Sequence, residues 1–174
     1  VFTGKLSVGI KFNVNGESVA MAVAVKTTDG KVFVECIDCR SVRQGIDWII
    51  TFLKDASKSI SNIVIDGANG QKILCDAMKD ASIKKKPILP TVGDIIVSSA
   101  RFESALFAQS ICHGEQPALM QIISNCEKRA IGSNGGFGYR SIKDGADIAL
   151  MDSVILAHWA CLNETETKKQ SFNY

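Results

Sequence analysis

Three apolar stretches of strand length open the chain. They cover residues 6–12, 19–26 and 31–38, and turns containing Gly16 and Gly30 separate them. Apolar runs of this length with turn residues between them are typical of strands joined by hairpins. The pattern therefore predicts a three-stranded antiparallel meander.

Helices then alternate with shorter apolar runs. Apolar residues recur at helical spacing over residues 42–55, 71–81 and 94–110. The short runs 62–65 and 87–89 predict strands. A helix over 118–126, a glycine-rich hairpin over 127–140 and a long helix over 144–162 follow, and the polar tail after Asn163 is expected to be frayed.

An antiparallel meander followed by alternating helices and parallel strands is the layout of a ribonuclease-H-like α/β fold. We expect a mixed five-stranded sheet, three antiparallel strands and then parallel ones, flanked by helices. The 174 residues suit one domain, residues 1–174, with its own core. Because the chain begins at Val1 and not at Met, we expect a fragment of a longer protein.

The composition is that of a globular protein, with 46% hydrophobic and 22% charged residues. No apolar run approaches the roughly 20 residues that a membrane-spanning helix needs, so we expect no membrane association. The formal net charge is only +2, so any surface that binds nucleic acid must be local. The six cysteines favour reduced thiols, and Cys36 and Cys39 lack the second ligand pair of a zinc site.

Carboxylates would carry phosphodiester cleavage in such a fold, because two divalent ions about 4 Å apart activate water and stabilise the leaving oxygen. Asp66 ends an apolar run and precedes Gly67, so it is expected at the carboxyl edge of a strand. Asp144 and Asp147 are expected to project from one face of the first turn of the last helix. The alternative role for each is to cap a helix or turn.

The first strand has a lysine where this fold typically has an aspartate. The sequence reads Gly9-Ile10-Lys11 where Gly-Ile-Asp is typical. A lysine cannot coordinate a cation, and its ammonium competes for the metal position. Glu17 is the nearest carboxylate that could lean back toward the site, although a plain exposed charge is the favoured interpretation. Asp152 is expected to face elsewhere and to be solvated.

The C-terminal third carries several motifs in a fixed order: a His-Gly-x-x-Pro-x-Leu segment, a helix that ends in Asn, a basic hairpin, and a final helix bearing Asp. The residues concerned are His113, Gly114, Pro117, Leu119, Asn125, Lys128, Arg129, Asp144, Asp147, Ala149 and Leu150. Together they resemble the end of the nuclease domain of tailed-phage terminase large subunits. The N-terminal part matches through its hairpin and Asp66, and residues 146–150 also resemble the last helix of RuvC-type resolvases.

The resemblance implies a metal-dependent endonuclease with a ribonuclease-H-like fold that cuts concatemeric viral DNA during packaging. It implies two Mg²⁺ or Mn²⁺ ions, with Asp66, Asp144 and Asp147 as catalytic metal ligands and Glu17 as a further candidate ligand. The implied partners are double-stranded DNA, the terminase ATPase domain, the small terminase subunit and the portal, in the host cytoplasm. No G-x-x-x-x-G-K-[ST] loop occurs, so the family's ATPase motor is expected to be missing from this chain.

Basic residues around the glycines of the predicted hairpin are the candidates for DNA contact. They are Lys128, Arg129, Arg140 and Lys143, and such side chains bind phosphates without reading sequence. For the lysines at 84–86 the favoured interpretation is solubilising charge. For His113 it is a structural hydrogen bond.

Two other functions stay open at this stage. A degenerate domain would keep the fold and bind DNA or packaging partners, but it would cut poorly because Lys11 replaces the first carboxylate. A resolvase-like or transposase-like protein would recognise branched DNA instead. The hairpin and the His-Gly-x-x-Pro segment favour the terminase over this last possibility.

Overall fold

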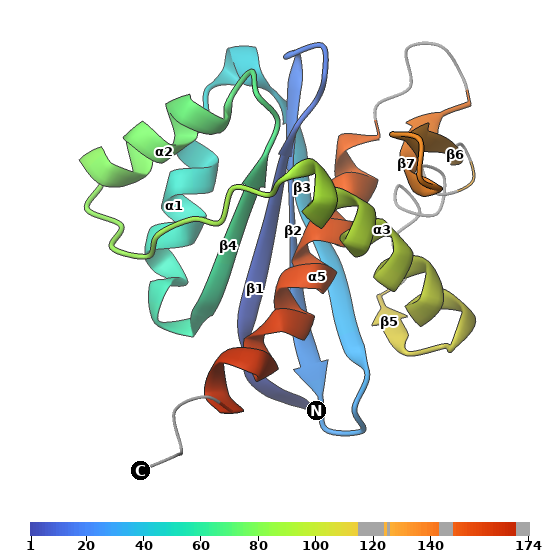
Figure 1. Ribbon diagram of the computed structural model, residues 1–174. Helices are drawn as coiled ribbons and strands as arrows, with labels where there is room; N and C mark the ends of the chain where they lie inside the picture. Colours follow the sequence, from blue (N-terminus) through green and yellow to red (C-terminus); the bar gives the residue numbers. More distant parts are fainter. Residues whose placement is uncertain (115–123, 125, 143–147, 170–174) are drawn as a thin grey trace.

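The computed structural model describes residues 1–114, 124, 126–142 and 148–169 (Figure 1). Its centre is a five-stranded sheet of order β4-β1-β2-β3-β5. The strands are β1 (Phe2–Phe12), β2 (Ser18–Thr27), β3 (Val32–Ser41), β4 (Ile60–Asp66) and β5 (Ile111–His113). The first three form an antiparallel meander, β4 is parallel to β1, and β5 is parallel to β3. The predicted mixed sheet and ribonuclease-H-like fold class are confirmed.

Helices cover both faces of the sheet. They are α1 (Asp47–Asp55), α2 (Gln71–Asp80), α3 (Val92–Phe107) and α5 (Ala149–Lys169), with 3₁₀ turns at Val42–Gln44 and Ser57–Ser59. Figure 1 shows α1 and α2 on one face, and α5 with α3 on the other. The predicted hairpin forms as β6 (Cys126–Ile131) and β7 (Gly136–Ser141). Within the described ranges, none of the helices has the length and apolarity that a bilayer crossing requires.

Three expectations need correction or fall outside the described residues. The run 87–89 is not a strand of the sheet: Ile88 makes one parallel bridge to Val64. Pro87, the first residue of the run, and Pro90, directly after it, have no N–H to extend a ladder. The fifth strand is β5, and α5 continues past Asn163, where a frayed tail was expected. Most of the helix predicted over 118–126 lies outside the described residues, and position 126 begins β6.

The two faces of β1 have different roles. Val8, Ile10 and Phe12 are buried against α1 and α2. Because successive side chains of a strand point to opposite faces, the two residues between them, Gly9 and Lys11, face α5. The alternation along a single strand therefore places one ionisable side chain beneath the last helix.

Helix α5 lies unusually close to the sheet. A Cβ at Gly9 would come 2.2 Å from the Ser153 carbonyl oxygen and 2.5 Å from the Ala157 nitrogen, so only glycine fits there. On β2 three fully buried alanines pack under the same helix: Ala20, Ala22 and Ala24. These small residues allow the helix backbone to approach the strands directly, which fixes its height above the sheet.

Helix α3 packs on the outer side of α5. It begins with a capping box, in which Thr91 and Asp94 each accept a hydrogen bond from the other's backbone N–H. Phe102 of α3 meets the His158 ring edge-on at 5.6 Å between ring centroids. Burial, together with the nearby charge of Arg101, lowers the pKa of the His158 imidazole to about 4.

Substitution of Gly9 tests the close approach of α5. Gly9→Ala forces a methyl group into the α5 backbone, so we expect a loss of about 3 kcal/mol in the free energy of unfolding, measured with urea. Gly93→Ala is the control, because its Cβ would have only Thr91 Oγ1 near it, at 3.6 Å. That variant should be as stable as the wild type or more so. Equal stability of the two variants would contradict the packing.

The buried His158 should make the protein sensitive to acid. The folded state holds this imidazole neutral down to about pH 4, whereas the unfolded chain protonates it near pH 6.5. The neutral ring therefore costs no stability above pH 6.5. Between pH 6.5 and about pH 4 it lowers the free energy of unfolding by about 1.4 kcal/mol per pH unit. When the pH is lowered from 7 to 5, the free energy of unfolding measured with urea should fall by about 2 kcal/mol less in His158→Leu than in the wild type. The same loss in both proteins would be inconsistent with a neutral buried ring.

Candidate functional site

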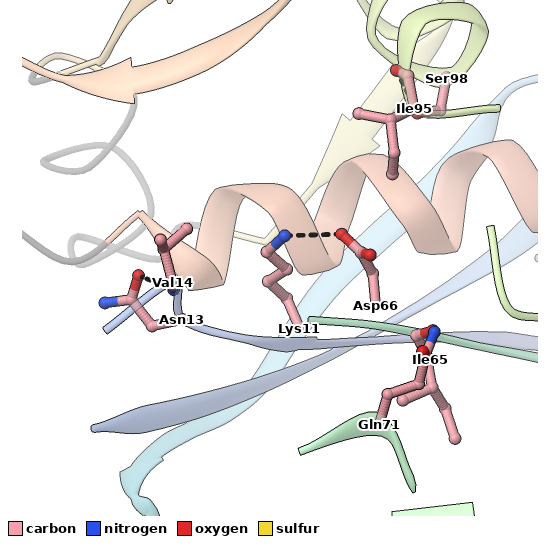
Figure 2. A network of polar contacts seen from close by, with 8 residues as sticks. All are labelled: Lys11, Asn13, Val14, Ile65, Asp66, Gln71, Ile95 and Ser98. Atoms are coloured by element: carbon pink, nitrogen blue, oxygen red, sulfur yellow. Dashed lines mark hydrogen bonds and ion pairs between the residues drawn. The ribbon is translucent and has the colours of Figure 1, made fainter. Parts of the chain in front are cut away.

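Lys11 and Asp66 form an ion pair at the carboxyl ends of β1 and β4. The two residues are direct partners in the parallel register of these strands, so their side chains rise side by side from the same face. Lys11 Nζ lies 2.6 Å from Asp66 Oδ2, and the side chains are only 15% and 21% exposed. Figure 2 shows the two groups pointing toward each other beside α5. Lys11 is thus paired with the carboxylate that was expected to bind a metal ion.

A cavity of about 210 Å³ opens above this pair. Strand, helix and hairpin residues line it together: Lys11, Asp66, Val92, Ile95, Ser98, Ser99, Arg129, Ile131, Gly138, Tyr139, Asp152, Ile155 and Leu156. Helix α5 forms one wall, and α3 and the β6–β7 hairpin form the others. Segments far apart in the sequence therefore meet at the carboxyl ends of the parallel strands β1 and β4.

Asp152 belongs to this cavity, which corrects the expectation that it faces elsewhere as a solvated residue. It is half-buried in the first turn of α5 and lines the same cavity as Asp66. Burial, with the Asp152 charge as a lesser cause, raises the pKa of Cys126 at the start of β6 to about 11. The sequence held one usable signal: Asp152 is a lone carboxylate in an otherwise apolar helical run.

The hairpin wall carries both basic and aromatic groups. Lys128 pairs with Glu103 of α3 at 2.7 Å and also lies 4.4 Å from the centre of the Phe137 ring. Arg140 pairs with Glu127 across the hairpin at 2.7 Å. Two of the four basic candidates therefore have their charge balanced locally.

Arg129 differs from its neighbours in the hairpin. It is exposed and lines the cavity, and it has no ion-pair partner among the described residues. Beside it, burial raises the pKa of Tyr139 to about 12, with Glu103 adding to the shift, so the phenol stays neutral. Arg129 is therefore the hairpin cation best placed to meet an anionic ligand.

Other candidates lie away from the cavity. Glu17 sits in the β1–β2 turn, where its carboxylate accepts a hydrogen bond from Asn15, and it does not line the cavity. His113 donates a hydrogen bond from Nδ1 to the Gly114 carbonyl at 2.8 Å, the structural role that was favoured. Lys85 donates to the Ser61 carbonyl, and the lysines at 84–86 line separate hollows beside α1 and α2.

Asp144, Asp147 and Lys143 lie outside the described residues. Position 148, which follows them, is described, and α5 begins at the next residue. Their proposed roles in metal and DNA binding therefore stay predictions.

The described residues do not fit a pair of divalent ions. Among them no group of three or more His, Cys, Asp or Glu residues could hold a metal. Two-metal centres need several oxygen ligands, and Mg²⁺ in particular is bound through carboxylates. Here Asp66 Oδ2 already accepts a hydrogen bond from the Lys11 ammonium. As described, the pair is neutral and does not itself activate water.

Comparisons by sequence and by structure gave different results. No protein-family model matches the chain, and no curated protein sequence matches it. The large terminase of bacteriophage HK97 superimposes over 91% of this chain with a TM-score of 0.66 and 15% identity. The present chain spans 40% of that protein.

Two isolated nuclease domains with bound metal are similar as well. The large terminase nuclease of thermophilic phage G20c, solved with bound magnesium, matches over 88% of this chain and 80% of its own, with a TM-score of 0.62 and 13% identity. The nuclease domain of the bacteriophage SPP1 large terminase, solved with bound Mn, matches over 93% and 86%, with a TM-score of 0.59 and 15% identity. Across most of its length, this chain has the fold of the large terminase nuclease domains of several phages.

Proposed function

We propose that this chain is the nuclease-type domain of a DNA-packaging terminase large subunit, and that it engages duplex DNA while cleaving it weakly. The Lys11–Asp66 ion pair carries this proposal, because it stands where the fold would otherwise present carboxylates to a metal. A divalent ion that stabilised a cleavage transition state would need those oxygens. The domain keeps the scaffold of a nuclease, and its central charge is already neutralised.

DNA binds at the face formed by the cavity and the β6–β7 hairpin. Arg129 offers a cation there that is not balanced by a neighbouring carboxylate in the described chain. The contact is to phosphate oxygens, because an exposed arginine on a hairpin binds the backbone of any sequence. Lys143, which lies outside the described residues, is a further candidate for contact with phosphate. The remaining partners proposed from the terminase fold are the ATPase domain, the small subunit and the portal.

A second function is favoured by one specific observation. Asp66 and Asp152 line the same cavity from β4 and from α5, and α5 starts directly after the segment that contains Asp144 and Asp147. With Lys11 displaced, these carboxylates would supply oxygen ligands for Mg²⁺ or Mn²⁺, and the domain would be an active metal-dependent endonuclease. Two of the structural neighbours are metal-bound nucleases.

The DNA face is tested by alanine substitutions in the hairpin. Removal of one unbalanced phosphate contact should make the plot of log affinity against log salt shallower, by about 0.9 in the magnitude of its slope. We expect this change in Arg129→Ala. Lys128→Ala is the matched control, since its partner Glu103 already neutralises that charge, and its slope should change by less than half as much. Fluorescence anisotropy with a labelled 20-base-pair duplex gives both slopes. If the wild type does not bind the duplex, the proposed DNA-binding function is wrong.

Plasmid nicking in Mn²⁺ separates the two functions. If the ion pair suppresses cleavage, Lys11→Asp should nick supercoiled plasmid about tenfold faster than the wild type, because it restores an oxygen ligand and removes a competing cation. Lys5→Asp makes the same charge change at an exposed position of β1 and should have no effect. A wild type as fast as Lys11→Asp, with activity abolished by Asp147→Ala, would establish the second function instead.

A further inference from the structure

We propose that Lys11 acts as a resident cation that closes the Asp66 site to divalent metal, so that one side chain decides whether this domain holds a metal ion. This proposal rests on the proposed function of a nuclease-type domain that cleaves weakly, but its test measures metal binding and requires no DNA. The described residues do not fit a two-metal centre, because Lys11 occupies the position beside Asp66.

The charge of Lys11 opposes a divalent ion beside the pair. The ammonium of Lys11 lies within hydrogen-bond distance of Asp66 Oδ2, at 2.6 Å. A divalent cation that approached this oxygen would meet a positive charge at close range and would have to displace it. The pair is largely shielded from solvent, and reduced solvent screening strengthens the attraction between its members and the repulsion of a third charge.

The strand register holds Lys11 in this place. It is paired with Asp66 on β4 and with Ala20 on β2, so its backbone is fixed on both sides. Above the sheet, α5 packs on Gly9 of the same strand. The backbone at position 11 is therefore held opposite Asp66, and only the lysine side chain has to be ordered to form the ion pair.

Besides Lys11, the cavity is lined by two carboxylates and by Arg129. Asp66 and Asp152 reach the cavity from β4 and α5, and position 11 reaches it from β1. Lys11→Asp would therefore place three carboxylates from three elements around one space. Oxygen ligands from separate, rigid elements are a suitable donor set for Mg²⁺ or Mn²⁺.

Mn²⁺ titration by calorimetry, followed by electron paramagnetic resonance of the free ion, tests the proposal directly. We expect Asp66→Asn to change Mn²⁺ affinity of the wild-type protein by less than twofold. Lys11→Asp should bind Mn²⁺ at least tenfold more tightly than the wild type, and Lys11→Asp/Asp66→Asn should lose that gain. Lys5→Asp, with the same charge change elsewhere on β1, should match the wild type.

Thermal unfolding supplies a second readout that does not depend on activity. In EDTA, Lys11→Asp should unfold at a lower temperature than the wild type, because two carboxylates then lie side by side. Saturating Mn²⁺ should raise its Tm by about 5 °C or more and leave the wild-type Tm unchanged. If Lys11→Asp does not fold, Lys11→Met carries the test: it frees Asp66 without adding a charge and should bind Mn²⁺ at least threefold more tightly than the wild type.

Two results would overturn the proposal. One is Mn²⁺ binding by the wild type that Asp66→Asn weakens tenfold or more, since Asp66 would then be open to metal. The other is equal Mn²⁺ affinity in the wild type, Lys11→Met and Lys11→Asp. Neither result would touch the duplex-binding function, which would instead fail through a wild type that does not bind DNA.

Discussion

The charge at the centre of this domain is set by a pairing of strands. Parallel pairing of β1 with β4 puts residues 11 and 66 directly opposite each other, on the face covered by α5. Whatever stands at position 11 therefore determines the electrostatic state of Asp66. With lysine there, the two side chains satisfy each other and the cavity above them has a neutral floor. The proposed closure of the Asp66 site to metal follows from this one contact.

Similarity of fold and difference in chemistry coexist in this chain because they depend on different residues. The sheet, α5 and α3 arise from buried apolar and small side chains that many sequences can supply, which is consistent with structural matches at 15% identity and below. The chemistry depends on a few ionisable groups at the strand ends. A single exchange at one of these positions alters the site and leaves the core intact.

The sequence predicted the parts of the fold that have strong local periodicity. The meander, Asp66 at the end of a strand and the glycine-rich hairpin were all readable because alternation, helical spacing and turn residues are local signals. The strand β5 was missed because it has only three residues. Asp152 was misjudged because its place depends on how α5 rotates over the sheet, and the partners of Lys128 and Arg140 depend on tertiary contacts that no local pattern encodes.

The floor of small residues beneath α5 separates architecture from electrostatics. Gly9 and the alanines of β2 hold the helix against the strands by backbone-level contact, so the spacing between the helix and the strand ends owes nothing to attraction between Lys11 and Asp66. The charge at position 11 can consequently change in evolution without a change in how α5 packs on the sheet. A substitution at position 11 can therefore change the charge of this site while Gly9 and the alanines of β2 keep α5 in place.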